Sequence, residues 1–91
     1  QTTAKFKMDA KTNSSWLEVV APDRPGLLSR LANIFFRFNL RVMTAKISTL
    51  GERVEDVFHL TDASRRPIED NDLVLRVEKT ICDELGDISQ T

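Results

Sequence analysis

The 91-residue chain is long enough for one small domain with a modest core and too short for a separate catalytic domain. Its hydrophobic content of 41% and charged content of 30% exclude a disordered chain, and its net charge of −1 gives no overall footprint for nucleic acid. A single cysteine, no long apolar run and no secretory leader predict a cytoplasmic protein without a membrane partner.

Two alternating segments at the start of the chain predict a β-hairpin. Residues 4–10 alternate polar and apolar side chains with the period of two of a half-buried strand, and the polar residues 11–14 supply a turn. Residues 16–21 alternate again and predict the second strand. One face of that strand carries Leu17, Val19 and Ala21, and the other carries Trp16, Glu18 and Val20.

The turn Ala21–Leu28, with the sequence APDRPGLL, joins this strand to a helical segment and is suited to holding a small anion. Pro22 and Pro25 fix their own φ and restrict the residue before them, so the turn is stiff without a ligand. Gly26 has no side chain where the helix begins, and a helix N-terminus presents unpaired N–H groups to a carboxylate or phosphate. The predicted ligand-binding residues are Asp23, Arg24, Pro25, Gly26, Leu27 and Leu28.

Two structural roles that involve no ligand remain open for this turn. A Pro-Gly pair often does no more than start a helix. Arg24 is suited to steering a carboxylate, and it is equally suited to a surface ion pair with Asp23.

Apolar residues recur at helical spacing from Gly26 to Phe38 and predict an amphipathic helix. The stripe consists of Leu27, Leu31, Ile34, Phe35 and Phe38, widened by Leu28 and Ala32. Asn39 tolerates the left-handed conformation and is a reasonable stop for the helix.

Residues 40–50 return to alternation and predict one strand, which turns at Gly51 into another strand over residues 54–61. On the second of these strands, strict alternation places Asp56 on the apolar face with Phe58 and Leu60. Three interpretations of Asp56 stay open: a β-bulge, a position near the ligand, or buried hydrogen bonds.

The C-terminal part predicts an exposed loop, a second helix and a short tail. Residues 62–69 are polar, and Asp70 or Asn71 can cap the helix that follows. The tail, residues 87–91, is short and polar. The helix carries Leu73, Val74, Val77, Ile81 and Leu85 and ends at Gly86.

The order strand, strand, helix, strand, strand, helix predicts an α+β fold, in which a four-stranded antiparallel sheet carries both helices on one face. From Trp16 onward this is the ferredoxin-like pattern without its last strand, and we predict that the N-terminal strand takes the vacant place at the sheet edge. The helix-free face would then need a cover, either a partner domain or a second copy in a homodimer. Its apolar residues are Trp16, Val20, Val42 and Val57.

The stretch from Leu17 to Leu28 resembles the signature of the ACT domains, small ferredoxin-like modules that bind amino acids and regulate enzymes. The resemblance covers roughly residues 16–85. A second stretch, Ala45–Asp62, is similar to a hairpin in the last ACT domain of a bifunctional enzyme of nitrogen signalling. This resemblance implies one ACT domain over residues 1–91, with its core at 16–86, excised from a larger multidomain enzyme.

The resemblance also implies a role in sensing glutamine or a similar small amino acid. In the enzyme that it indicates, one domain adds uridylyl groups to the signalling protein PII, another removes them, and the terminal ACT pair senses glutamine. The implied partners are therefore the preceding ACT domain, the catalytic domains and, through them, PII. The catalytic motifs have no counterpart in this chain, so we expect no enzyme activity and no cofactor here; UTP and a divalent metal would belong to the missing domains.

Amino-acid sensing is not the only function that the sequence allows. The main alternative is an interaction domain that binds no ligand and docks a neighbouring domain or a second copy through its sheet. RNA binding is disfavoured because the sheet lacks the paired aromatic residues that stack bases. His59 stands outside any Cys/His cluster and Cys82 has no nearby His or Asp at a suggestive spacing, so both are expected to be structural.

Overall fold

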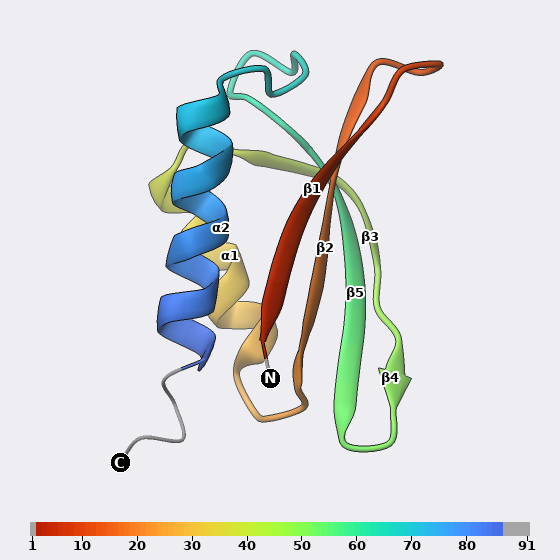
Figure 1. The fold of residues 1–91 in the computed structure, drawn as a ribbon, viewed down its shortest axis with the longest axis vertical. Helices are drawn as coiled ribbons and strands as arrows, with labels where there is room; N and C mark the ends of the chain where they lie inside the picture. Colours follow the sequence, from red (N-terminus) through yellow and green to blue (C-terminus); the bar gives the residue numbers. More distant parts are fainter. Residues whose placement is uncertain (1, 87–91) are drawn as a thin grey trace.

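The computed structural model describes residues 2–86, in which two helices cover one face of an antiparallel sheet (Figure 1). The predicted ferredoxin-like α+β fold is confirmed. The sheet has the strand order β1-β2-β5-β3, with the short β4 pairing β5. The predicted tail at residues 87–91 lies outside the described residues. In chain order the elements are β1 (Thr3–Asp9), β2 (Ser14–Pro22), α1 (Leu27–Arg37), β3 (Arg41–Lys46), β4 (Thr49–Leu50), β5 (Arg53–Thr61) and α2 (Asn71–Gly86).

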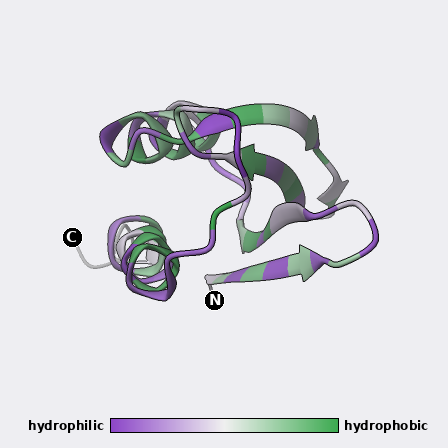
Figure 2. Ribbon diagram, turned by 90° about the horizontal axis from the view of Figure 1, so that it is seen from above, coloured by the Kyte–Doolittle hydropathy of each residue, from purple (hydrophilic) through white to green (hydrophobic). Residues whose placement is uncertain are grey.

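The N-terminal strand takes the edge position that the sequence predicted for it. β1 pairs antiparallel with β2, so that Phe6 lies opposite Leu17. Figure 2 shows the alternation of hydrophilic and hydrophobic residues along β1. On the outer side of β1, the Phe6 N–H donates to Oε2 of Glu78 on α2 at 2.8 Å. The helix therefore covers part of a strand edge that would otherwise expose unpaired backbone groups.

The core lies between the helices and the inner face of β2 and β5. Alternation on the strands and helical spacing on α1 and α2 bring the apolar stripes together, as predicted. Asp70 caps α2, because its Oδ1 accepts the N–H of Asp72 at 2.9 Å. Asn39 stops α1 with a φ of 58°, as predicted. The side chains that are fully buried include Leu17, Val19, Leu31, Ile34, Leu60, Val77 and Ile81.

Two residues predicted to widen the buried stripe of α1 are not buried. Leu28 is 48% exposed, and Ala32 is exposed as well. Leu28 lines a cavity together with Ile47 rather than packing against the sheet. For Leu28 the prediction was wrong because it assumed that core packing surrounds the first turn of the helix, where the structure has a cavity.

The single strand predicted over residues 40–50 is interrupted twice. The register against β5 shifts between Val42 and Thr44. Val42 pairs with Leu60, a residue on the core side of the sheet, so the prediction that placed Val42 on the helix-free face is wrong. A second break separates β3 from β4, although the part of β3 after the shift, from Thr44 to Lys46, has the same register against β5 as β4. At that break the Asp56 side chain, not a regular ladder bond, accepts the Ser48 N–H at 3.3 Å. This bond to the Asp56 carboxylate explains why alternation alone did not predict the break between β3 and β4.

No helix in residues 2–86 is long and apolar enough to cross a membrane.

Candidate functional site

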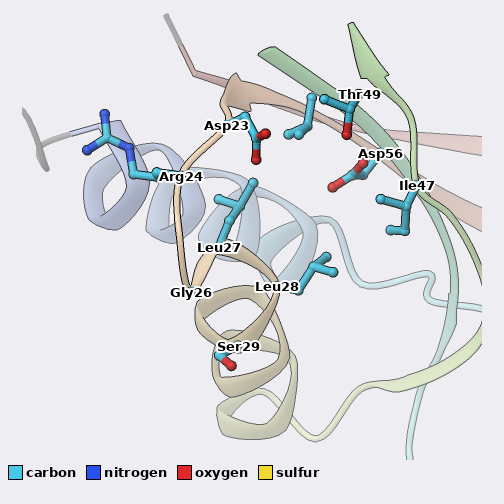
Figure 3. A pocket seen from close by; sticks show the side chains of 10 residues that line it. Asp23, Arg24, Gly26, Leu27, Leu28, Ser29, Ile47, Thr49 and Asp56 are labelled. Atoms are coloured by element: carbon cyan, nitrogen blue, oxygen red, sulfur yellow. The ribbon is translucent and has the colours of Figure 1, made fainter. Parts of the chain in front are cut away.

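A cavity of about 360 Å³ lies where the β2–α1 turn faces the β3–β4 segment (Figure 3). Its volume is within the range of sites for small molecules, roughly 300–1,000 Å³. Three parts of the chain build it: the turn, the first turn of α1, and the inner face of the strands. The lining residues are Asp23, Arg24, Gly26, Leu27, Leu28, Ser29, Ile47, Thr49, Val54 and Asp56.

The β2–α1 turn is held in place by backbone bonds. The Asp23 N–H donates to the Glu52 carbonyl at 2.8 Å, and the Leu27 N–H donates to the Arg24 carbonyl at 3.3 Å. Gly26 is the N-cap of α1 with a φ of 81°, in the left-handed region that glycine adopts at little cost. The turn thus presents the start of the helix to the cavity in a fixed orientation.

The start of α1 offers free backbone donors to this cavity. No side chain caps the helix, and the N–H groups of Leu28 and Ser29 have no partner among the described residues. The sequence prediction had assigned the amides of Gly26, Leu27 and Leu28 to an anion, but the Leu27 amide is used within the turn. Ser29 was missed; its position three residues after the N-cap was the signal that could have found it.

Asp56 is the buried acid of the cavity. Its side chain is 1% exposed, Oδ1 accepts the Ser48 N–H, and Oδ2 has no hydrogen-bond partner. Burial raises the pKa of the Asp56 carboxyl, the Ser48 N–H lowers it, and the charge of Asp23 raises it again. In Figure 3 the side chains of Asp23 and Asp56 point into the same space. Of the three open interpretations of Asp56, its buried hydrogen bond and its position at the cavity are both observed.

The predicted turn residues fall into three groups. Asp23, Gly26, Leu27 and Leu28 line the cavity together, whereas Pro25 is not part of its lining. Arg24 lines the cavity, but its guanidinium points away from the two carboxylates (Figure 3). Arg24 forms no ion pair with Asp23, nor with any other acidic side chain in residues 2–86.

The other reactive residues have structural surroundings. His59 stacks on Trp16 across β2 and β5, with ring centroids 4.9 Å apart and an angle of 22° between the planes. Cys82 is half-buried, and its thiol lies 3.8 Å from the Thr2 carbonyl oxygen. Within residues 2–86 no group of three or more His, Cys, Asp or Glu side chains is arranged to hold a metal ion.

A family model described as "ACT domain" matches residues 15–74. The chain belongs to the ACT domain family. The match runs from β2 into α2 and so includes the turn and the cavity described above. The ACT domain is a regulatory module and not a catalytic one, in agreement with the expectation from the sequence.

This ACT domain is similar to part of a much larger enzyme in several bacteria. The bifunctional uridylyltransferase/uridylyl-removing enzyme of Pseudomonas aeruginosa is 54% identical over 78 residues, which are 86% of this chain and 9% of that protein. The enzyme of the same name from Stutzerimonas stutzeri is 52% identical over 77 residues, 85% of this chain and 9% of that protein. For Azotobacter vinelandii the identity is 51% over 79 residues, 87% of this chain and 9% of the enzyme. The chain spans about a tenth of the length of these relatives.

Proposed function

We propose that this ACT domain senses glutamine and regulates a bifunctional uridylyltransferase/uridylyl-removing enzyme of which it is one part. Glutamine binding would favour one arrangement of the domains and so shift the balance between uridylylation and deuridylylation of the nitrogen-signalling protein PII. Catalysis, with UTP and a divalent metal, would take place in other domains of the cytoplasmic enzyme. The identity of 54% to an enzyme whose name states both activities supports this assignment.

The cavity beside the start of α1 carries the ligand part of the proposal. A free amino acid brings a carboxylate and an ammonium, and both lose hydration when they bind. The free amides of Leu28 and Ser29 and the positive end of the helix suit the carboxylate. The carboxyl groups of Asp23 and Asp56 supply negative charge within the same cavity. Groups for both ends of a zwitterion are therefore present in one site.

Glutamine titration followed by calorimetry and by backbone amide chemical shifts tests the proposal. We expect heat of binding, with the largest shifts at Gly26, Leu28 and Ser29. Absence of both signals at millimolar glutamine would contradict ligand sensing by this chain.

A matched pair of variants adds a competing charge at the site. Ser29→Glu places a carboxylate in the first turn of α1, where its negative charge opposes the carboxylate of the ligand at the positive end of the helix. We expect this variant to bind glutamine at least about tenfold more weakly, a change of about 1.4 kcal/mol. Asn33→Glu, an exposed change one turn further along the helix, is the control and should bind as the wild type does.

Docking of a neighbouring domain or a second copy is a second candidate function, and the exposed apolar edge of the sheet favours it. Apolar side chains gather along β3, β4 and the segment between them, where large exposed hydrophobic groups often mark an interface. The exposed residues of this edge are Val42, Met43, Ile47 and Leu50, between 41% and 55% exposed. By contrast, Trp16, Val20 and Val57 on the helix-free face are half-buried.

Sedimentation of the wild type and of Met43→Glu distinguishes the two candidates. Self-association that the charge abolishes, combined with no glutamine binding, supports a docking domain alone. A monomer that binds glutamine supports sensing without this contact between copies.

A further inference from the structure

Asp56 stands out because one of its oxygens is buried without a partner. Only 1% of the residue is exposed, yet Oδ2 makes no hydrogen bond in residues 2–86. Buried carboxylates are normally paired with a charge or with several donors, because removing them from water is costly. The cavity is the direction in which this oxygen can find a partner: Asp56 lines it, and its side chain points into it in Figure 3.

Asp23 adds a second negative charge beside the unpaired Oδ2 of Asp56. Its carboxyl group points into the same space from the β2–α1 turn, and its charge raises the pKa of Asp56. Two like charges at one cavity repel each other, and the Arg24 guanidinium, which points away, does not offset them. A ligand group that enters between them is best matched when it is cationic and carries several N–H donors.

We infer that Asp56 is a specificity-determining residue, whose free Oδ2 and the Asp23 carboxylate together receive the α-ammonium of an amino acid ligand. This inference rests on the proposed function and orients the ligand within it. The carboxylate of the ligand lies at the amides of Leu28 and Ser29, and its ammonium lies toward β5. The neutral amide end of glutamine points to the remaining polar lining, where Thr49 stands.

Charge decides between the ammonium and the side-chain amide of glutamine as the partner of Asp56. A carboxamide supplies N–H donors but no net charge, so it would leave two carboxylates without compensation in a partly dehydrated space. An ammonium supplies three donors and a positive charge and satisfies both carboxylates. The site therefore selects α-amino acids over carboxylic acids that lack the amino group.

The test compares two ligands and three forms of the 91-residue chain by calorimetry. The ligands are glutamine and 4-carbamoylbutanoate, which is glutamine without its amino group. The chains are the wild type, Asp56→Asn, and the control Glu55→Gln, which removes a negative charge from the neighbouring position on the opposite face of β5. Asn can still accept the Ser48 N–H, and a circular dichroism spectrum checks that each variant is folded.

We expect the wild type and Glu55→Gln to bind glutamine at least about tenfold more tightly than 4-carbamoylbutanoate, and Asp56→Asn to lose most of that preference. Equal binding of both ligands by the wild type overturns the inference without using any variant. Unchanged preference in folded Asp56→Asn overturns it as well. Failure of the wild type to bind either ligand contradicts the proposed function instead, and the two failures are thereby distinguishable.

Discussion

The Asp23 N–H donates to the Glu52 carbonyl oxygen at 2.8 Å and joins the β2–α1 turn to the β4–β5 turn. Each of these turns contains a glycine in the left-handed region, Gly26 with a φ of 81° and Gly51 with a φ of 67°. The cavity between the turn and the strands thus depends on two turns that need glycine at their left-handed positions, and one backbone hydrogen bond joins these turns.

Gly26→Ala should lower the free energy of unfolding by about 1 kcal/mol or more, because an L side chain is strained at this φ. Space is not the cause, since a Cβ at Gly26 would meet nothing within 4 Å. Gly26→Asn should lose less, because asparagine tolerates the left-handed region better than alanine does. Urea unfolding measures all three chains, and an alanine variant as stable as the wild type would rule out strain at this position.

Asp56→Asn should change the pH dependence of stability. A carboxyl with a raised pKa holds its proton more tightly in the folded chain than in the unfolded one. Its contribution to stability therefore falls as the pH rises from the ordinary value of 3.8 through the raised pKa, and it is constant above that range. The variant lacks this loss, so it should gain stability relative to the wild type as the pH rises.

Urea unfolding from pH 4 to pH 8 measures this difference for the ligand-free chains. Glu55→Gln serves as the control for removal of one charge from β5. A wild type that gains stability relative to Asp56→Asn as the pH rises would show that the Asp56 pKa is lowered and would contradict this prediction.

Most of the fold could be predicted from the regular spacing of apolar residues along the strands and helices. The alternation around Leu17 and the helical stripe around Leu31 each have one period, and each predicts which side chains are buried. The place of β1 followed from topology, because a hairpin can deliver a strand only beside its partner. Periodicity did not predict the structure of residues 40–50 correctly. The register changes after Val42, and at the break between β3 and β4 the Ser48 N–H donates to the Asp56 side chain of β5. Those contacts are made between strands and leave no pattern in one strand alone.

The candidate site was predictable in part for a similar reason. Turn chemistry around Gly26 indicated the helix start, and the structure places that start beside a cavity. The opposite wall, with Ile47 and Thr49, comes from a segment more than 15 residues away, and nothing local marks it. Asp56 was singled out because a charged residue broke an apolar face, yet alternation could not choose among its three interpretations.

Ser15→Ala should destabilise the fold by about 1–3 kcal/mol. The Ser15 hydroxyl is buried and accepts the Ile68 N–H at 3.0 Å, which joins the start of β2 to the loop before α2. Alanine leaves that amide buried without a partner. Ser64→Ala, at an exposed loop position, is the control and should change stability little. Equal effects of the two changes in thermal unfolding would show that the Ser15 bond contributes nothing specific.

Glu78→Ala should loosen the edge strand β1. The Glu78 carboxylate accepts the Phe6 N–H at 2.8 Å, and this bond lies on the side of β1 that no other strand pairs. Its loss should cost about 1 kcal/mol and speed hydrogen exchange of the Phe6 amide about fivefold. Glu78→Gln keeps an oxygen acceptor of nearly the same shape, so it should protect the amide better than alanine does. If both variants exchange at the wild-type rate, packing of α2 against β1, and not this hydrogen bond, holds the strand in place.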